Sequence, residues 1–314
     1  MAFLRGFGCY LPARVVDNAE LAPLVGADPG WLLRSTGIEQ RRFAADGETV
    51  SSLGTEASRD CLKRCAAAAG EVALVIVASG SGEFRFPGPA TAIARGLGIP
   101  GVPAIDLPMA SAGSLFGLSL ASDLAPRYGN VLVVGSEIMS RVVKLEPPGR
   151  DTAILFGDGA GAALVSATGG FAEIRDSVLA SDGEFGETLR LCLDAPLHMD
   201  GRTIILHASR KMPRAILQLL ERNRLQPAEV GAYILHQANL NLITRVAHAV
   251  GAPESRFFSN LARYGNTSSA SMLIAAAEWR AGNPGPLAQP LVFAAFGAGL
   301  NWGAVLAMPP AAMP

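Results

Sequence analysis

The sequence predicts a layered α/β fold built from two related halves. Short apolar runs rich in β-branched residues alternate along the 314-residue chain with segments of helical periodicity, which is typical of layered α/β proteins. Two pairs of passages are also similar to each other. FGDGAG (156–161) resembles FGAGLN (296–301), and EVALVIVASG (71–80) resembles EVGAYILHQA (229–238). These widely separated copies indicate an internal duplication.

Four apolar runs predict buried strands, and four longer segments predict helices. The strands are expected at 73–79, 130–136, 232–237 and 289–297, and the helices at 51–69, 112–125, 208–224 and 268–281. We place the boundary between the two halves at the run SATGGFAEI, so that they comprise residues 1–166 and 167–314. Because this run is too short to be a long flexible linker, we expect the halves to share one interface.

The composition limits the classes of partner. Half of the residues are hydrophobic, 17% are charged and the net charge is −1, so no overall field attracts nucleic acid or an anionic membrane. No apolar run reaches the roughly 18 residues of a membrane span, and the start lacks the pattern of a signal peptide. The four cysteines (Cys9, Cys61, Cys65 and Cys192) are too scattered for a disulfide framework, which predicts reduced thiols and a cytoplasmic protein.

Three polar residues lie where an α/β fold commonly presents functional side chains. Ser111 precedes a glycine- and alanine-rich helix, His236 ends a strand in ILHQANLNLI, and Asn266 lies in a turn before a helix in RYGNTSSASM. The glycines of FGAG (296–299) leave backbone N–H groups that could stabilise an oxyanion. Each feature also has a structural interpretation: a helix cap, a satisfied core histidine, turn chemistry and a tight bend.

Five motifs together resemble those of the β-ketoacyl-ACP synthase III family, in order and spacing. They are IDLPMASAGSLFGL, LFGDGAGAAL, LHQANL, YGNTSSAS and FGAGLNWG, and the similarity covers nearly the whole chain. LHQAN together with YGNTS is the specific part. The resemblance implies a thiolase-like fold of two duplicated halves, each with a mixed five-stranded sheet layered between helices. It also implies a homodimer and an acyltransferase that uses a coenzyme A thioester as substrate, with no resident cofactor.

The resemblance assigns roles to individual residues of this chain. Ser111 stands at the position of the nucleophilic cysteine, with His236 and Asn266 as the other catalytic residues. The backbone amides of Ser111 and Ala298 would form the oxyanion hole. The remaining matches are Trp31 and Arg150, which would sandwich the coenzyme A adenine, Phe86, which would line the acyl pocket, and Asn239, which would support the site. A surface helix contact for Trp31 and a solvated loop charge for Arg150 are the alternatives.

Serine in place of cysteine changes the expected chemistry. A thiol near a helix N-terminus can attack as a thiolate, whereas a hydroxyl needs a base, and His236 is the candidate that the motif supplies. The oxygen ester formed on Ser111 is a poorer electrophile than a thioester. We therefore expect acyl transfer to be favoured over carbon–carbon condensation.

Two further departures concern the acyl donor. The family motif RTGIxxR is STGIEQR here, so Ser35 replaces an arginine, with Arg34 adjacent, and Asn241 replaces the arginine that follows HQANL. Both changes weaken the expected contacts with coenzyme A or with an acyl carrier protein as partner. A basic rim could compensate, unless it is an ordinary solvated helix face, and it would consist of Arg210, Lys211, Arg214 and Arg245.

Three functions remain open. The first is an acyltransferase that takes an acyl group from acyl-CoA or an acyl carrier protein onto Ser111, in fatty-acid or polyketide-type biosynthesis. The second is a noncatalytic ketosynthase-like partner subunit, and the third is a standard condensing enzyme that uses malonyl-ACP, with serine introduced artificially at residue 111. An α/β-hydrolase is disfavoured because MASAG (109–113) lacks the first glycine of G-x-S-x-G. GDGAG lacks the dinucleotide-binding spacing, and the four histidines share no metal-ligand spacing.

Overall fold

The computed structural model describes residues 1–192 and 194–310. Its ten main strands lie in the order β12-β11-β13-β14-β8-β1-β7-β6-β4-β5. The first five of these strands in the chain and the later five are arranged in the same way, because β5-β4-β6-β7-β1 corresponds to β12-β11-β13-β14-β8. The first five strands in the chain are β1 (Ala2–Tyr10), β4 (Val72–Ala78), β5 (Ala104–Leu107), β6 (Asn130–Ile138) and β7 (Asp158–Ser166). The later five are β8 (Ala172–Ser181), β11 (Ala232–Leu235), β12 (Phe257–Phe258), β13 (Leu291–Gly297) and β14 (Asn301–Met308).

The strand directions also repeat, which confirms the predicted duplicated fold. In each set of five strands, the three outer strands run parallel and the two inner strands pair antiparallel. Among the strands of the described residues, β1 and β8 join the two sets, where Ala2–Leu4 pairs with Ala172–Ile174. The boundary at residue 166 stays a prediction, although β7 ends at Ser166 and β8 begins at Ala172.

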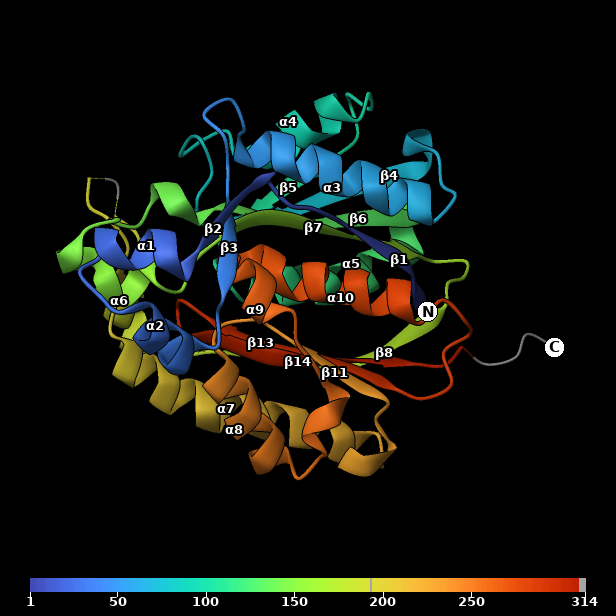
Figure 1. Cartoon of the computed structure of the whole chain (residues 1–314). Helices are drawn as coiled ribbons and strands as arrows, with labels where there is room; N and C mark the ends of the chain where they lie inside the picture. Colours follow the sequence, from blue (N-terminus) through green and yellow to red (C-terminus); the bar gives the residue numbers. More distant parts are fainter. Residues whose placement is uncertain (193, 311–314) are drawn as a thin grey trace.

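The helices form three layers, and one set of strands lies between each outer layer and the central layer (Figure 1). The outer helices on one side are α3 (Val50–Arg64) and α4 (Pro89–Gly96), and those on the other side are α7 (Gly201–Arg222) and α8 (Leu240–Val250). The central layer consists of α5 (Gly113–Tyr128) and α10 (Ser271–Gly282). The remaining helices and strands are shorter: α1 (Asn18–Leu24), α2 (Pro29–Thr36), α6 (Arg150–Ala153), α9 (Leu261–Tyr264), β2 (Arg14–Asp17), β3 (Gln40–Phe43), β9 (Leu189–Arg190) and β10 (His198–Met199).

The central helices are built from small residues because sheets cover them on both sides. Residues Ser271–Ala277 of α10 are all buried, so this first part of the helix has no exposed face. The sheet adapts with glycine: a Cβ on residue 161 would lie 2.6 Å from the Cβ of Leu273, and one on residue 135 would lie 2.4 Å from the carbonyl oxygen of Ser269. Close packing therefore brings the start of α10 against the first set of strands.

The predicted strands and helices are confirmed, and the two largest differences are at the start of α7 and the end of α3. Helix α7 begins at Gly201 rather than at 208, because the side chain of Asp200 caps it by accepting hydrogen bonds from the backbone N–H groups of Arg202 and Thr203. Helix α3 ends at Arg64 rather than at 69, and Ala66 beyond it has a φ of +49°. A left-handed residue cannot continue a right-handed helix.

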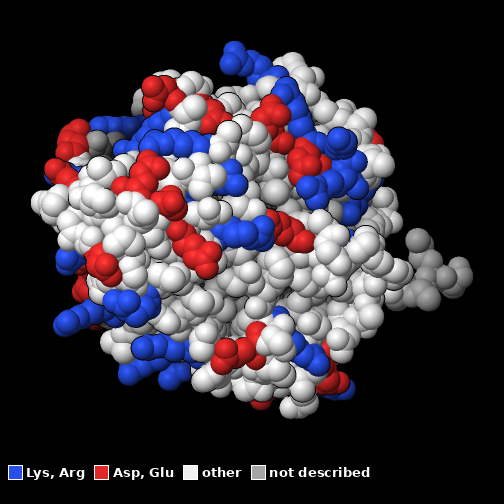
Figure 2. Space-filling view, viewed as in Figure 1, with Lys and Arg blue, Asp and Glu red and all other residues white. Residues whose placement is uncertain are grey.

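The surface shows charges of both signs. On the face in Figure 2, lysine and arginine side chains alternate with aspartate and glutamate rather than gathering into one patch. None of the helices in the described part of the chain is long and apolar enough to span a membrane.

Candidate active site

Ser111 lies in a tight, buried turn between β5 and α5. Its φ is +59°, a left-handed conformation that is uncommon for serine. Gly297, at the end of β13, packs against this turn. A Cβ on residue 297 would lie 2.5 Å from the carbonyl oxygen of Ala110 and 2.9 Å from the Cβ of Ser111. Glycine at 297 is therefore what allows the second set of strands to approach the predicted nucleophile.

His236 follows β11 and is 5% exposed. Its backbone N–H donates to the carbonyl oxygen of Ala294 at 2.8 Å, which holds it against β13. The ring Nδ1 lies 2.6 Å from the Oγ of Ser271. Burial lowers the pKa of His236 from 6.5 to about 4, so the ring is neutral at physiological pH.

Asn266 is oriented by backbone hydrogen bonds. Its own N–H donates to the carbonyl oxygen of Leu155 at 2.9 Å, and its Oδ1 accepts from the N–H of Ser268 at 2.9 Å. This leaves Nδ2, which has no hydrogen-bond partner within residues 1–192 and 194–310, as the free end of the amide. The amide NH₂ of Asn266 is therefore available to donate a hydrogen bond to a bound molecule.

A cavity of about 510 Å³ brings the three predicted catalytic residues together. Ser111, His236 and Asn266 all line it, although no hydrogen bond joins Ser111 to the His236 ring within the described residues. Apolar side chains form much of the remaining wall, and they come from α7, from α8, from β9, β10 and β13, and from the segment after α6. They are Ile154, Leu155, Phe156, Leu189, Met199, Ile204, Ile205, Ala208, Met212, Leu242 and Phe296. Such a lining suits an apolar chain attached to a group that reacts at Ser111.

Trp31 and Arg150, the residues predicted to sandwich adenine, lie against each other. Trp31 lines the cavity, and the guanidinium carbon of Arg150 is 5.3 Å from the centre of its ring. This is a cation–π contact. For an adenine to lie between them, the two side chains would have to separate.

Asn239 lines the cavity but is bound into the scaffold. Its Oδ1 accepts from the N–H of Asn241 and so caps α8, while its Nδ2 donates to the carbonyl oxygen of Ser35 at 3.0 Å. Asn241 also donates to Ser35, at 3.4 Å. Ser35 and Asn241, which stand where the family motifs have arginine, are thus joined by a hydrogen bond between neutral groups. The neighbouring Arg34 is largely exposed, and its guanidinium lies 3.9 Å from Asp28.

Phe86 and Ala298 lie outside the lining of the cavity. Phe86 is 85% exposed in the single chain. Ala298 follows Gly297, which does line the cavity, and its carbonyl oxygen accepts from Nδ2 of Asn301 at 2.5 Å. The other amide assigned to the oxyanion hole, that of Ser111, donates to the Oγ of Ser268 at 3.0 Å. An oxyanion would have to share that amide with Ser268 or displace it.

Sequence reasoning missed two buried serines that hold the site together. Ser268 accepts from the Ser111 amide, and Ser271 contacts His236. The signal was the polar run TSSAS at the start of an otherwise apolar helix, which resembles ordinary capping residues.

Lys211, predicted as part of a basic rim, instead donates to Oδ2 of Asp182 at 2.5 Å and lies 4.2 Å from the centre of the Trp302 ring.

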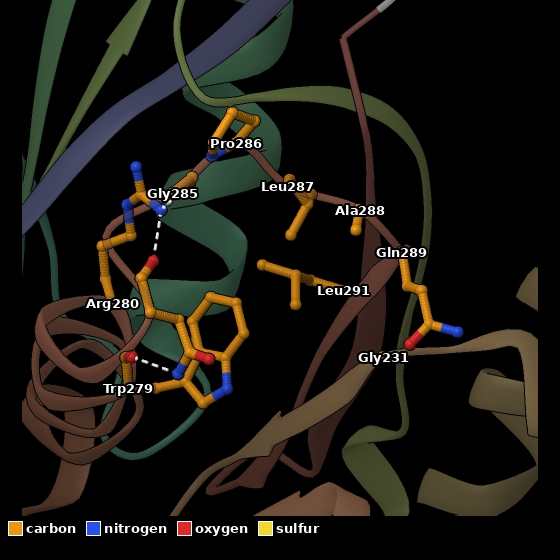
Figure 3. Close-up of a pocket in the computed structure, with 10 residues that line it drawn as sticks. Gly231, Trp279, Arg280, Gly285, Pro286, Leu287, Ala288, Gln289 and Leu291 are labelled. Atoms are coloured by element: carbon orange, nitrogen blue, oxygen red, sulfur yellow. Dashed lines mark hydrogen bonds between the residues drawn. The ribbon is translucent and has the colours of Figure 1, made fainter.

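A second hollow, of about 230 Å³, lies beyond the C-terminal end of α10 (Figure 3). Arg280 closes one side by donating to the backbone carbonyls of Asn283 and Gly285. None of the predicted catalytic residues lines it. Within the described residues, no cluster of three or more His, Cys, Asp or Glu side chains could hold a metal ion.

The buried His236 is expected to make folding depend on pH. Because its pKa is about 4 in the folded protein and 6.5 ordinarily, the unfolded chain binds more protons between these values. The free energy of unfolding should therefore be highest above about pH 6.5 and fall by about 2 kcal/mol between about pH 7 and pH 5. Urea unfolding at both pH values would measure this. The His236→Gln variant should lose this part of the pH dependence, whereas His248→Gln, which replaces an exposed histidine, should keep it. If the free energy of unfolding changed equally with pH in the wild-type protein and in both variants, the assignment to His236 would be contradicted.

Comparisons with known proteins agree with the fold and with the family resemblance. Residues 105–183 match the model of the family described as 3-oxoacyl-[acyl-carrier-protein (ACP)] synthase III, and residues 220–308 match the model of its C-terminal part. The chain is 35% identical to β-ketoacyl-[acyl-carrier-protein] synthase III of Oleidesulfovibrio alaskensis, over 97% of this chain and 98% of that protein.

Solved structures give the same result. The crystal structure of 3-oxoacyl-[acyl-carrier-protein] synthase III from Aquifex aeolicus superimposes with a TM-score of 0.94 at 33% identity, covering 98% of this chain and all of that one. The priming β-ketosynthase of the R1128 polyketide biosynthetic pathway superimposes with a TM-score of 0.90 at 31% identity, over 99% of this chain and 97% of that one. The fold and the relatives thus define a transferase with a thiolase-like fold. The chain belongs to the 3-oxoacyl-ACP synthase III family.

Proposed function

We propose that this protein takes an acyl group from acyl-CoA or from an acyl carrier protein onto Ser111 and passes it to an acceptor. The observation that supports this most is the shared cavity: Ser111, His236 and Asn266 line it together with Trp31 and an apolar wall. The similar proteins are named as β-ketoacyl- or 3-oxoacyl-[acyl-carrier-protein] synthase III and as a priming β-ketosynthase of a polyketide biosynthetic pathway. Fatty-acid or polyketide-type biosynthesis is therefore the setting that we propose.

The acylation step would run as a nucleophilic substitution. The Oγ of Ser111 attacks the thioester carbonyl, its proton passes to Nε2 of His236, and the carbon–sulfur bond breaks as the oxygen ester forms. The leaving sulfur takes that proton and departs as a thiol. The negative charge on the carbonyl oxygen would be held by the amides of Ser111 and Ala298. No resident cofactor takes part.

A second candidate function is decarboxylative condensation with a malonyl thioester. His236 and Asn266 favour it, because Nδ2 of Asn266 is a donor and the neutral His236 ring carries one N–H. Two such donors would stabilise the enolate oxygen that forms when the carboxylate leaves as carbon dioxide. The acylated Ser111 would then be the electrophile.

We also propose a homodimer formed at the edge of the sheet. Strand β5 is the outermost strand of the first set, and its Ile105 is 41% exposed. Phe84 and Phe86, 71% and 85% exposed, precede it in the chain. Pairing two copies along β5 would cover these apolar side chains and could bring Phe86 of one copy to the pocket of the other.

Intact-mass spectrometry after incubation with a panel of acyl-CoAs tests the covalent role of Ser111. We expect the wild-type protein to gain the mass of one acyl group and the Ser111→Ala variant to gain none. The thermal unfolding of the variant serves as its folding control. An adduct that persists in Ser111→Ala would show that another residue carries the acyl group.

A further inference from the structure

Ser271 places a hydroxyl group between His236 and the backbone. It is the first residue of α10 and is 2% exposed. Its Oγ lies 2.6 Å from Nδ1 of His236 and accepts a hydrogen bond from the N–H of Gln237 at 3.0 Å. The hydroxyl is therefore the contact that holds the far side of the catalytic ring.

The number of available hydrogen bonds decides the direction of the contact with His236. A hydroxyl has one proton to donate and two lone pairs to accept with. If Nδ1 carried the ring proton, both lone pairs of Oγ would be used by Gln237 and His236. The hydroxyl proton would then need another acceptor, and Ser271 makes no third side-chain hydrogen bond within residues 1–192 and 194–310. If the hydroxyl donates to Nδ1, every group is satisfied.

We propose that Ser271 is a positioning residue that holds neutral His236 as the tautomer protonated on Nε2. The ring then presents a hydrogen-bond donor to the cavity rather than a free lone pair. Since an unsatisfied buried donor is costly, the opposite tautomer should be about 5- to 150-fold less populated. This deepens the proposed function, on which its kinetic part rests.

The two tautomers suit different chemical steps. Removing the proton of Ser111 needs a lone pair on Nε2, which belongs to the minor tautomer. Stabilising an oxyanion needs the N–H on Nε2, which belongs to the major one and complements Nδ2 of Asn266. Ser271 therefore favours oxyanion stabilisation at the expense of base catalysis.

Nitrogen NMR of protein labelled with ¹⁵N-histidine tests the tautomer without any substrate. The described chain contains His198, His207, His236 and His248, and the signals of His236 are identified by their loss in the His236→Gln variant. At neutral pH we expect Nε2 to be the protonated nitrogen and Nδ1 the unprotonated one. Protonation on Nδ1 in the wild-type protein would overturn the proposal, whether or not the protein transfers acyl groups.

A kinetic test uses two neighbouring serines. Ser271→Ala removes the preference between tautomers, so single-turnover acylation of Ser111 should become about 3-fold faster or more. Ser269→Ala is the matched control, because its buried hydroxyl donates to the carbonyl oxygen of Ala78 instead. It should leave the His236 signals unchanged and should not accelerate acylation, and Ser271→Thr should restore the wild-type tautomer. Slower acylation in Ser271→Ala with an unchanged tautomer would show a merely structural role and refute the proposal.

Discussion

In single-turnover experiments with the same acyl-CoA, the Ser111→Cys variant should be acylated at least about 100-fold faster than the wild-type protein. A hydroxyl must lose its proton to a base during the attack, and such base catalysis contributes about 10²- to 10⁴-fold. A thiol has an ordinary pKa near 8.5 and is partly a thiolate before the donor arrives. The N-terminus of α5, which begins two residues after Ser111, favours that thiolate further.

Quenched-flow mixing followed by intact-mass spectrometry would give both rates, and Ser111→Ala sets the background. The condensation activity with a malonyl thioester should rise as well, because a thioester is a better electrophile than an oxygen ester. If cysteine at residue 111 were acylated no faster than serine, proton removal would not limit the reaction. The mechanism in which His236 acts as a base would then be wrong.

Replacing His236 with alanine should slow acylation of Ser111 by about 10²- to 10⁴-fold, the contribution expected of a general base. The reason is that solvent would otherwise have to remove the hydroxyl proton in a buried turn. In the Ser111→Cys background the same replacement should have a much smaller effect, since a thiolate needs no base for its attack. Single-turnover rates of the wild-type protein, both single variants and the double variant measure this difference.

His236→Ala also removes a buried ring, so its folding must be checked separately. His236→Gln is the second variant, because it keeps more of the side-chain volume, and urea unfolding would show whether each variant is folded. An unchanged acylation rate in a folded variant would exclude His236 as the base. Equal losses in the serine and cysteine backgrounds would indicate that His236 acts on the carbonyl oxygen rather than on the nucleophile.

Much of the fold could be predicted from the sequence because its signals are local and repeated. The apolar runs around β4, β6, β11 and β13 are long enough to identify buried strands, and the paired FGDGAG and FGAGLN passages indicate the duplication. The start of α7 was missed because its first turn depends on one capping aspartate rather than on apolar periodicity. The positions of Ser111, His236 and Asn266 at strand and helix ends also follow from local patterns.

The sequence by itself determined which residues stand at the ends of strands and helices, and therefore the fold class and the three candidate catalytic residues. Only the tertiary structure decided how those residues are oriented. Ser268, Ser271 and Gly297 act across elements that are far apart in the chain. A hydrogen bond between such elements, or an approach so close that only glycine fits, leaves no periodic signal. Lys211 illustrates the same limit, because its charge is evident in the sequence but its partner Asp182 depends on packing.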